Sequence, residues 1–457
     1  MAGIGFQLNK ILDKGSYAGV VQAYGYAALV SSGPWVISIL CLALFGAWVG
    51  WGDSGMESFF GAIMYVYAFS LVLTGPLQLV LTRYAADLLY LEDQEKVYPS
   101  FLAALGGGMF VAALLGAIFF IGFVPGSLLF RCMAAQLFSL VCGIWISMVF
   151  VSAIRNYWGV LVAFLTGFGL SLTAAAAGFQ VAGAEGAMPG FLLGQMVLLL
   201  ILVGLIRQEF NGKESFSFLW FVYFRKHWAL ALCGFVYNLG IWGDKFIHWW
   251  FSPYRLQVAG ALWASPVYDQ AIYLSYLAIV PGMAVFFLAM EARFAEKYEM
   301  FFKQVIDKGS LDSLRQRREE MLRALQGGIM MVLRVQGLVT IFLILGAGPL
   351  LGQLGLNAMQ VTVFQISLVG VFLLVIFLSF LTVLFYLDKP RAALFSCAVF
   401  AAVNIGVTFL SLAAGERFYG SGLVAGAACG AFFAAQMANR HIRDLIYETF
   451  SSQPLST

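Results

Sequence analysis

Long runs of apolar residues recur along the chain, and short polar segments separate them. A helix needs about 20 mostly apolar residues to cross the hydrocarbon core of a bilayer. Windows of this length predict six spans in the first half of the chain, near residues 25–50, 59–82, 101–124, 132–154, 158–179 and 187–206. They predict six more in the second half, near residues 228–251, 267–290, 328–353, 361–386, 391–414 and 420–438. The pattern therefore predicts an all-α integral membrane protein with about twelve transmembrane helices.

Composition supports a membrane domain and argues against several other classes. Apolar residues make up 61% of the 457 positions and charged residues 11%, whereas soluble domains have about 45–50% and about 25%. The net charge of +3 is too small to indicate a nucleic-acid partner. The six cysteines lie in or beside apolar runs without a CxxC pair, so we expect packing residues and no metal site.

The distribution of Lys and Arg predicts the orientation. Four of the 26 basic residues fall in segments on one side of the predicted membrane, and the other 22 share the side of the amino terminus. The four are Arg131, Lys245, Arg255 and Arg417. Because cytoplasmic segments are enriched in Lys and Arg, we expect both termini to be cytoplasmic, which requires an even number of spans.

Two sequence echoes indicate an internal duplication. Glycine recurs at every fourth position where the sixth and twelfth spans begin, at Gly186, Gly190 and Gly194 and at Gly422, Gly426 and Gly430. Such a stripe lets a neighbouring helix backbone approach closely. In addition, Arg-Tyr-Ala-Ala-Asp at 83–87 follows Pro76, and Arg-Phe-Ala-Glu at 293–296 follows Pro281. The two halves are predicted to be parallel six-helix repeats, an arrangement in which two lobes can rock around a cavity.

The predicted organisation has five parts. They are an amino-terminal lobe (1–207), a cytoplasmic linker (208–226), a carboxy-terminal lobe (227–440), a cytoplasmic helical loop within that lobe (291–326) and a cytoplasmic tail (441–457). The loop places Phe294, Tyr298, Phe301, Phe302 and Val305 on one helical face, before a break at Gly309 and Ser310. Two interpretations stay open: an interfacial helix with its aromatic face among lipid headgroups, or a dock for a cytoplasmic partner.

The sequence lacks the patterns that an enzyme or an ATP-driven pump would need. It contains no phosphate-binding G-x-x-x-x-G-K-[ST] loop, no HExxH and no D-x-D pair. Every predicted extramembrane segment is too short for a soluble catalytic domain. We therefore expect a transporter rather than an enzyme, with no catalytic residues and no cofactor.

Ionisable residues in or near the spans are the candidate site, because charges are costly in lipid and usually face a cavity, a partner charge or the interface. Arg83 and Asp87 are spaced to pair along one face of the second span. A structural ion pair and a cavity-lining role are both open for them.

A second group lies toward the predicted outer side of the seventh and eighth spans. Asp244, Lys245 and His248 occupy the last third of the seventh span, where Lys245 could also snorkel to the interface. Asp269 opens the eighth span and shares a helical face with Tyr273 and Tyr276. Together with Arg83 and Asp87, these six residues form the predicted substrate pathway.

Aromatic residues crowd the stretch from Tyr237 to Tyr276, including Trp249 and Trp250. Flat rings suit the apolar faces of sugars. The alternative is an aromatic belt at the membrane interface, which accounts for Trp249 and Trp250.

Three Gly and Pro pairs mark candidate hinges, because proline frees a backbone carbonyl within a helix. They are Gly33 with Pro34, Gly75 with Pro76, and Pro281 with Gly282. Static packing kinks are the alternative.

The amino-terminal residues resemble a known family. The opening Met-Ala-Gly-Ile-Gly-Phe-Gln-Leu at 1–8, and then Ser-Ser-Gly-Pro-Trp at 31–35, resembles the PelG family of membrane transporters in the Pel exopolysaccharide system. The Gly-Asp-Lys-Phe at 243–246 is similar to the family's seventh span. The resemblance covers the full length and implies a twelve-span fold of the polysaccharide branch of the multidrug/oligosaccharidyl-lipid/polysaccharide (MOP) flippase superfamily.

The resemblance also implies substrate, partners and location. It implies export of an amino-sugar-rich, cationic polysaccharide across the bacterial inner membrane for biofilm matrix formation. The implied partners are a cytoplasmic glycosyltransferase and inner-membrane Pel subunits. A cationic polymer would favour Asp87, Asp244 and Asp269 in the path, whereas a diphosphate-linked lipid would favour the basic residues. No site residue is carried over from the family.

We therefore expect a flippase-like exporter of exopolysaccharide and keep two alternatives. An ion-coupled multidrug antiporter of the same fold would need a carboxylate cluster in one lobe, and the amino-terminal lobe offers little beyond Asp87. A non-transporting scaffold would instead anchor a glycosyltransferase through residues 291–326.

Overall fold

The computed structural model describes residues 17–49, 56–152, 154, 156–210 and 216–451. The motif at 1–8 and the basic residues Lys10 and Lys14 lie outside the described residues. The long helices are α2 (Tyr17–Val49), α3 (Glu57–Tyr90), α4 (Val97–Gly116), α5 (Leu128–Val151), α6 (Tyr157–Glu209), α8 (Trp228–Phe251), α12 (Leu311–Gln353), α13 (Ala358–Tyr386), α14 (Pro390–Ala414) and α15 (Ser421–Arg443). The shorter elements are η1 (Gln94–Lys96), η2 (Ala117–Ile121), α7 (Trp220–Lys226), β1 (Leu256–Ala259), β2 (Leu262–Ala264), α9 (Pro266–Leu277), α10 (Ile279–Leu288), η3 (Ala289–Phe294), α11 (Ala295–Ile306), η4 (Glu416–Phe418) and α16 (Leu445–Ser451).

Within the described residues, each of the twelve predicted spans coincides with helix. Ten helices of the described chain are long and apolar enough to cross a membrane. One of them, α6, has non-helical backbone at Ala182 and Gly183, which divides it into segments that match the fifth and sixth predicted spans. The 24-residue α8 is not among the ten, but it matches the seventh span in length and position. The all-α integral membrane fold is confirmed.

The described helices form two compact units. One unit is Gly33–Pro266, and the other combines Met1–Ser32 with Val267–Thr457. This grouping places α8 with the helices that precede it, whereas the sequence assigns residues 227–440 to the second lobe. The lobe boundaries at 207 and 227 therefore stay a prediction. One unit boundary falls between Ser32 and Gly33, beside the Gly33 and Pro34 pair.

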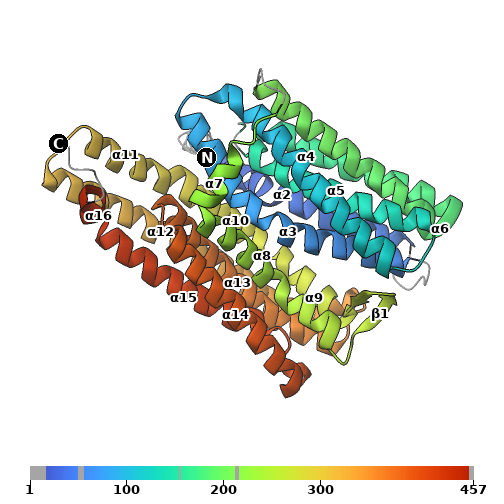
Figure 1. Cartoon of the computed structure of the whole chain (residues 1–457). Helices are drawn as coiled ribbons and strands as arrows, with labels where there is room; N and C mark the ends of the chain where they lie inside the picture. The colour runs from blue at the N-terminus through green and yellow to red at the C-terminus, as the bar shows by residue number, and fades with distance from the viewer. Residues whose placement is uncertain (1–16, 50–55, 153, 155, 211–215, 452–457) are drawn as a thin grey trace. The chain divides into compact units, whose positions relative to one another are not determined.

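In the unit Gly33–Pro266, α5 packs against α3, α4 and α6, and these helices run alongside one another in Figure 1. The first glycine stripe lies in the second half of α6 and faces its first half. A Cβ on Gly190 would collide with the backbone of Ala174, and one on Gly186 would collide with the carbonyl of Gly178. The stripe therefore sets the close approach of the two segments, as predicted.

In the unit that contains Val267–Thr457, α13 packs against both α12 and α15, and α15 also packs against α14. The second glycine stripe has the same role as the first. A Cβ on Gly426 would lie 2.8 Å from the Cβ of Asn404, and one on Gly430 would lie 3.0 Å from the Cβ of Phe400. Both stripes thus hold a span against the span that precedes it in the chain.

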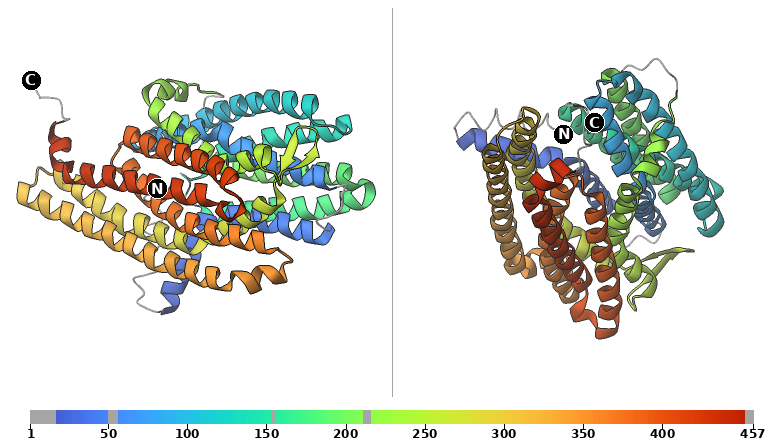
Figure 2. Two further views of the ribbon diagram at one scale, coloured as in Figure 1. Left: turned by 90° about the horizontal axis from the view of Figure 1, so that it is seen from below. Right: turned by 60° about the vertical axis from the view of Figure 1, so that its left-hand side comes forward.

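The predicted cytoplasmic loop is helical and breaks where expected. Helix α11 ends at Ile306, and the Ser310 side chain accepts a hydrogen bond from the Ser313 amide at the start of α12. Helix α11 packs along α12, and both appear in gold in Figure 2. The rings of Phe294 and Tyr298 lie 5.5 and 5.6 Å from the ring of Tyr386 at the end of α13. These two rings therefore contact protein on at least one side, and the headgroup and docking interpretations of the loop both stay predictions.

The eighth span is interrupted, and a glutamine from α12 fills the break. Helix α9 ends at Leu277, and α10 begins at Ile279. The Gln336 amide donates to the carbonyl oxygen of Ala278 (2.8 Å), and its oxygen accepts from the Gly282 amide (2.9 Å). Ala278 and Gly282 are four residues apart, so the fully buried Gln336 replaces one backbone bond of a regular helix. The break beside Pro281 is therefore stabilised from outside its own helix.

The other two candidate hinges lie within continuous helices. Pro34 is inside α2, and Pro76 is inside α3. Neither proline interrupts its helix in this conformation.

A small charged network ties down the carboxy-terminal helix. Glu448 of α16 lies 2.9 Å from Lys389 and 2.8 Å from His441. Burial acts to raise the pKa of Glu448, but the hydrogen bonds with Lys389 and His441 outweigh it and hold this pKa below its usual range. The ionised carboxylate therefore links α16 to α15 and to the start of α14.

Replacement of Gly190 tests the packing within α6. We expect Gly190→Ala to cost about 1–3 kcal/mol because the Ala174 backbone must shift to admit the methyl group. The measurement is the thermal unfolding of the purified protein in detergent. Gly204→Ala is the matched control in the same helix, because no atom lies within 4 Å of the added Cβ. Equal melting temperatures for the two variants would contradict the packing role.

Replacement of Gln336 tests the break. Gln336→Leu leaves the Ala278 carbonyl and the Gly282 amide without their partner, and each such buried group costs about 1–3 kcal/mol. Gln365→Leu is the control, because it removes one hydrogen bond, from Gln365 to the Ile344 carbonyl within α12. We expect Gln336→Leu to lower the melting temperature clearly more than Gln365→Leu does. A smaller drop for Gln336→Leu than for the control would refute the role of Gln336 in stabilising the break.

Candidate functional site

Helices α3 and α8 of the unit Gly33–Pro266 approach each other closely at two glycines. A Cβ on Gly75 would lie 2.7 Å from the carbonyl oxygen of Gly234 and 2.9 Å from the amide nitrogen of Asn238. A Cβ on Gly234 would collide with the Gly75 carbonyl. Asn238 donates to the Gly234 carbonyl at 2.9 Å. The Gly75 and Pro76 pair is therefore a close-packed crossing point, which supports the packing interpretation at this position.

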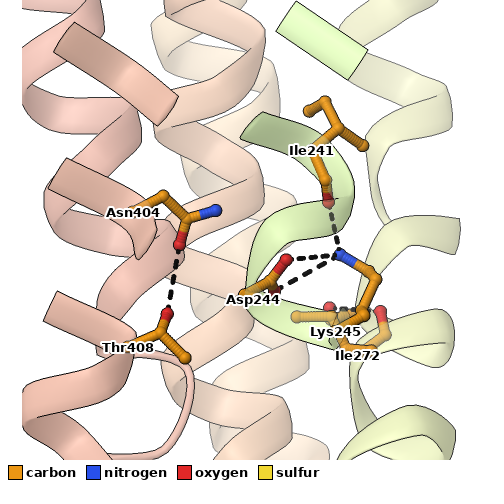
Figure 3. Close-up of polar contacts among 7 residues, drawn as sticks. Ile241, Asp244, Lys245, Ile272, Asn404 and Thr408 are labelled. Atoms are coloured by element: carbon orange, nitrogen blue, oxygen red, sulfur yellow. Dashed lines mark hydrogen bonds and ion pairs between the residues drawn. The ribbon is translucent and has the colours of Figure 1, made fainter. Parts of the chain in front are cut away.

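Beyond the crossing, α8 carries a buried ion pair between sequence neighbours. The Lys245 ammonium lies 3.1 Å from the Asp244 carboxylate and donates to the Ile241 carbonyl at 2.8 Å (Figure 3). The side chains are 2% and 0% exposed, so neither reaches the solvent as a snorkelling residue would. The same ammonium lies 5.7 Å from the centroid of the Trp242 ring. His248, one turn further along α8, is also fully buried.

This geometry neutralises the charge of α8 within a single turn. A single uncompensated charge in a low-dielectric interior costs several kcal/mol, and removal of one partner from a buried pair costs about 3–5 kcal/mol. Since the two residues are adjacent, the pair adds no net charge to the helix. The snorkelling interpretation of Lys245 is wrong in this conformation, because the side chain turns back to the Ile241 carbonyl.

Aromatic rings from α3 and α8 stack on one another beside the ion pair. Tyr65 and Trp249 stack at 4.9 Å between centroids, with an interplanar angle of 17°. Phe69 and Phe246 stack at 4.8 Å, and the Phe246 ring also lies 5.6 Å from the Trp250 ring. We name these five residues the aromatic stack.

The aromatic stack changes the interpretation of the two tryptophans. Trp249 is fully buried against Tyr65, so it is not part of an aromatic belt facing lipid. Trp250 is 37% exposed and remains compatible with an interfacial position. Because Trp249 already stacks on protein, its ring faces are not available for a sugar in this conformation.

A β-hairpin covers the end of α3 next to the aromatic stack. Strands β1 and β2 pair antiparallel, with Gln257 opposite Trp263. The Tyr65 hydroxyl accepts a hydrogen bond from the Trp263 amide at 3.0 Å. The Arg255 guanidinium lies 4.7 Å from the centroid of the Trp263 ring. The hairpin thus fixes the Tyr65 hydroxyl by a backbone hydrogen bond.

Arg83 and Asp87 form the predicted ion pair, but far from the aromatic stack. Their side chains are 3.0 Å apart and remain about one-third exposed, at 36% and 29%. They lie on the same helix as Tyr65 at a separation of 18 residues, which corresponds to about 27 Å along α3. The structure therefore separates this pair from Asp244, Lys245 and His248.

Asp269, Tyr273 and Tyr276 belong to α9 in the other unit. Asp269 is 5% exposed and Tyr276 is 8% exposed, so both are buried. Next to Asp269, Gln270 accepts a hydrogen bond from Gln360 of α13 at 2.7 Å. The sequence analysis did not predict this glutamine pair. The available signal was Gln270 itself, a polar residue next to Asp269.

The sequence analysis also missed neutral polar contacts that run through the unit Gly33–Pro266. Tyr67 donates to Gln195 (3.4 Å), and Gln195 donates to Ser171 (3.0 Å). In parallel, Trp145 donates to Ser70 (2.9 Å). Buried side-chain hydrogen bonds of this kind hold helices together in lipid. Among the described residues, no three His, Cys, Asp or Glu side chains gather in an arrangement suited to a metal ion.

The fold is similar to that of solved transporters. A MOP superfamily transporter from Pyrococcus furiosus Vc1 shares 14% sequence identity and a TM-score of 0.62, covering 92% of this chain and 96% of that one. A multidrug resistance MATE family transporter in an inward-facing conformation gives a TM-score of 0.64 at 14% identity, covering 92% of this chain and 95% of that one. In an outward-facing conformation, a transporter of the same kind gives 0.60 at 14% identity, covering 92% and 96%.

Family comparison adds what the fold cannot. No curated protein matches the sequence. The family model of PelG, the exopolysaccharide exporter (EPS-E), matches residues 1–450 and so spans both units. The chain therefore belongs to the PelG family of exopolysaccharide exporters and is a multi-pass membrane protein with a MOP transporter fold.

Proposed function

We propose that this chain moves a cationic, amino-sugar-rich exopolysaccharide across the bacterial inner membrane for a biofilm matrix. The observation that carries the proposal is the family match over residues 1–450. Both termini lie in the cytoplasm under this proposal, which agrees with the excess of Lys and Arg in the segments on that side. The chain acts as a transporter without catalytic activity of its own.

The proposed pathway uses the polar groups of α3, α8 and α9. It includes Arg83, Asp87, Asp244, Lys245, His248, Asp269, Tyr273 and Tyr276. A polymer that carries ammonium groups needs carboxylates along its route, but an unpaired carboxylate would be costly in the membrane. The contact between Asp244 and Lys245 offers a solution, because a substrate ammonium can replace the Lys245 ammonium at the carboxylate. Such an exchange leaves the net charge around Asp244 unchanged if Lys245 moves toward water.

The proposed movement uses the Gly and Pro pairs. The boundary between the two compact units falls at Gly33, next to Pro34. The break beside Pro281 and Gly282 depends on a side chain from another helix, so it can be made and broken without unfolding α9 or α10. These two positions are the proposed hinges, and Gly75 with Pro76 supplies a fixed crossing about which α3 and α8 move together.

The proposed partners are a cytoplasmic glycosyltransferase and inner-membrane Pel subunits. The segment formed by α11 and the start of α12 is the candidate dock. Ile306 and Leu311 are 74% and 52% exposed at the turn between the two helices. Exposed apolar side chains in an otherwise charged segment suit a protein partner.

A single and a double substitution separate folding from transport. We expect Asp244→Asn to reduce the folded protein, because a buried Lys245 without its carboxylate costs about 3–5 kcal/mol. Asp244→Asn/Lys245→Met removes both charges, so we expect it to restore folded protein without restoring secretion. The measurements are secreted polymer and intracellular polymer, each normalised to folded protein in the membrane.

Asp93→Asn is the matched control, because its partner Lys96 is 42% exposed and outside the spans. Normal secretion in the double variant would show that the pair is only structural and would contradict its place in the pathway. Asp269→Asn and Arg83→Gln, measured in the same way, test the remaining charges. Two results together would favour the scaffold function instead. Deletion of the exposed turn at 306–311 would abolish both glycosyltransferase co-purification and secretion, and neutralising all the pathway charges would leave secretion intact.

A further inference from the structure

An apolar groove runs between α12 and α15 in the unit that contains Val267–Thr457. It has a volume of about 620 Å³, which is within the range of about 300–1,000 Å³ that is usual for ligand sites. Leu322, Ile329 and Leu333 line it on α12, and Phe432 and Ala435 line it on α15. Phe380 of α13, which packs against both helices, completes the wall. This groove is separate from the residues of the proposed pathway.

The groove is open on the side that faces hydrocarbon. Met330 and Phe432 line it and are 48% and 58% exposed. The exposed face of α12 continues beyond Met330 with Leu338, Phe342 and Leu345, which are 56%, 72% and 75% exposed. A continuous exposed apolar face on a membrane helix contacts lipid chains. A lipid can therefore enter the groove laterally from the bilayer.

The groove begins in the predicted cytoplasmic loop and extends into the first turns of the ninth span. Leu322 and Leu333 are eleven residues apart on α12, which corresponds to about 16 Å along the helix. The ninth span is predicted to begin near residue 328, so the inner half of the groove lies within the span and the outer half at the membrane surface. An acyl chain could thus enter the inner half while its headgroup stays at the cytoplasmic interface.

Three amide side chains, Gln326, Gln436 and Asn439, line the middle of the groove. Arginines lie beside one of its ends: Arg318 is one turn before Leu322 on α12, and Arg440 and Arg443 flank Ile442 on α15. The Arg318 guanidinium donates to the Arg443 carbonyl at 3.1 Å and so links the two helices above the groove.

The arginines at this end carry positive charge that the described residues do not neutralise. No ion pair in the described part of the chain involves Arg318, Arg440 or Arg443. The Nε atom of Arg318 is buried and lacks a hydrogen-bond partner among the described residues. The acidic neighbour Glu320 already pairs with Arg317 at 2.8 Å. The end of the groove therefore presents guanidinium groups to an anion.

We propose that this groove binds an anionic phospholipid, with an acyl chain along α12 and α15 and the phosphate at Arg318, Arg440 and Arg443. A mostly apolar groove with a basic end matches a molecule that has an anionic head and an apolar tail. Basic pockets between membrane helices bind anionic headgroups for the same electrostatic reason. A free phosphate would leave the apolar part of the groove unused, and a zwitterionic lipid would gain little from the arginines.

Photo-crosslinking tests the proposal with a defined probe. The full chain is reconstituted into phosphatidylcholine nanodiscs that contain either phosphatidylglycerol or phosphatidylcholine with a diazirine on the acyl chain. We expect the phosphatidylglycerol probe to label residues 322–333 and 432–442, as located by mass spectrometry. Unlabelled phosphatidylglycerol should abolish this labelling, and unlabelled phosphatidylcholine should not. Equal labelling of the groove by both probes would overturn the proposal. No labelling of the groove would also overturn it and would favour a protein segment as occupant.

Substitutions test the two parts of the site separately. Arg318→Gln and Arg443→Gln should each lower the labelling by phosphatidylglycerol about fivefold, as expected for one basic residue near an anionic headgroup. Ala435→Trp should abolish it by filling the groove while the arginines remain. Arg391→Gln is the matched control, because Arg391 is an exposed arginine at the start of α14, outside the groove. Labelling that falls in the control as much as in Arg318→Gln would overturn the specific site, provided that all variants elute as monodisperse protein.

Discussion

In the hydrocarbon core, no water is present to satisfy a backbone amide or carbonyl that leaves the helical pattern. Most of the described chain obeys this constraint with long regular helices, and the exceptions define its architecture. Where α9 gives way to α10, the Gln336 side chain takes the place of one backbone hydrogen bond by contacting both Ala278 and Gly282. An interruption of the backbone is thus compensated by a residue from α12, and the position of α12 becomes coupled to the shape of the eighth span.

The same constraint explains why small residues and compensated charges occur together. Helices in lipid associate through close packing rather than through a hydrophobic driving force. The contact of Gly75 with Gly234 brings α3 and α8 together at backbone distance. Close approach then buries the side chains beyond the crossing, including Asp244 and Lys245, which remain stable there because each neutralises the other. The aromatic stack and the β-hairpin complete the same interface, with ring contacts between α3 and α8 and a hydrogen bond from the Trp263 amide to Tyr65.

Features that depend on local periodicity could be predicted from the sequence. The twelve spans follow from apolar runs, the Arg83 and Asp87 pair follows from a spacing of four, and the glycine stripes follow from a period of four. Features that depend on contacts between distant segments could not. Nothing in the local sequence indicates that Trp249 stacks on Tyr65, or that Gln336 reaches Ala278, because these partners are separated by many residues and meet only after packing. Hydropathy likewise separates the fifth and sixth predicted spans by a short polar gap. In the structure, both spans belong to α6 and are joined by a kink of only two residues, Ala182 and Gly183.

The weak hydropathy of α8 has a consequence for how the protein is made. Asp and Lys are among the residues most costly to insert, at about 2.5–3.5 kcal/mol each at a helix centre, so Asp244 and Lys245 in the last third of α8 weaken its tendency to partition on its own. Helix α3 precedes α8 in the chain, so insertion in chain order would place its Gly75 surface in the membrane before α8. Capture by α3 at the Gly234 crossing can then supply the stabilisation that the sequence of α8 lacks. With insertion in this order, the glycine crossing would serve biogenesis as well as the finished fold, because the integration of one helix would depend on the prior insertion of another.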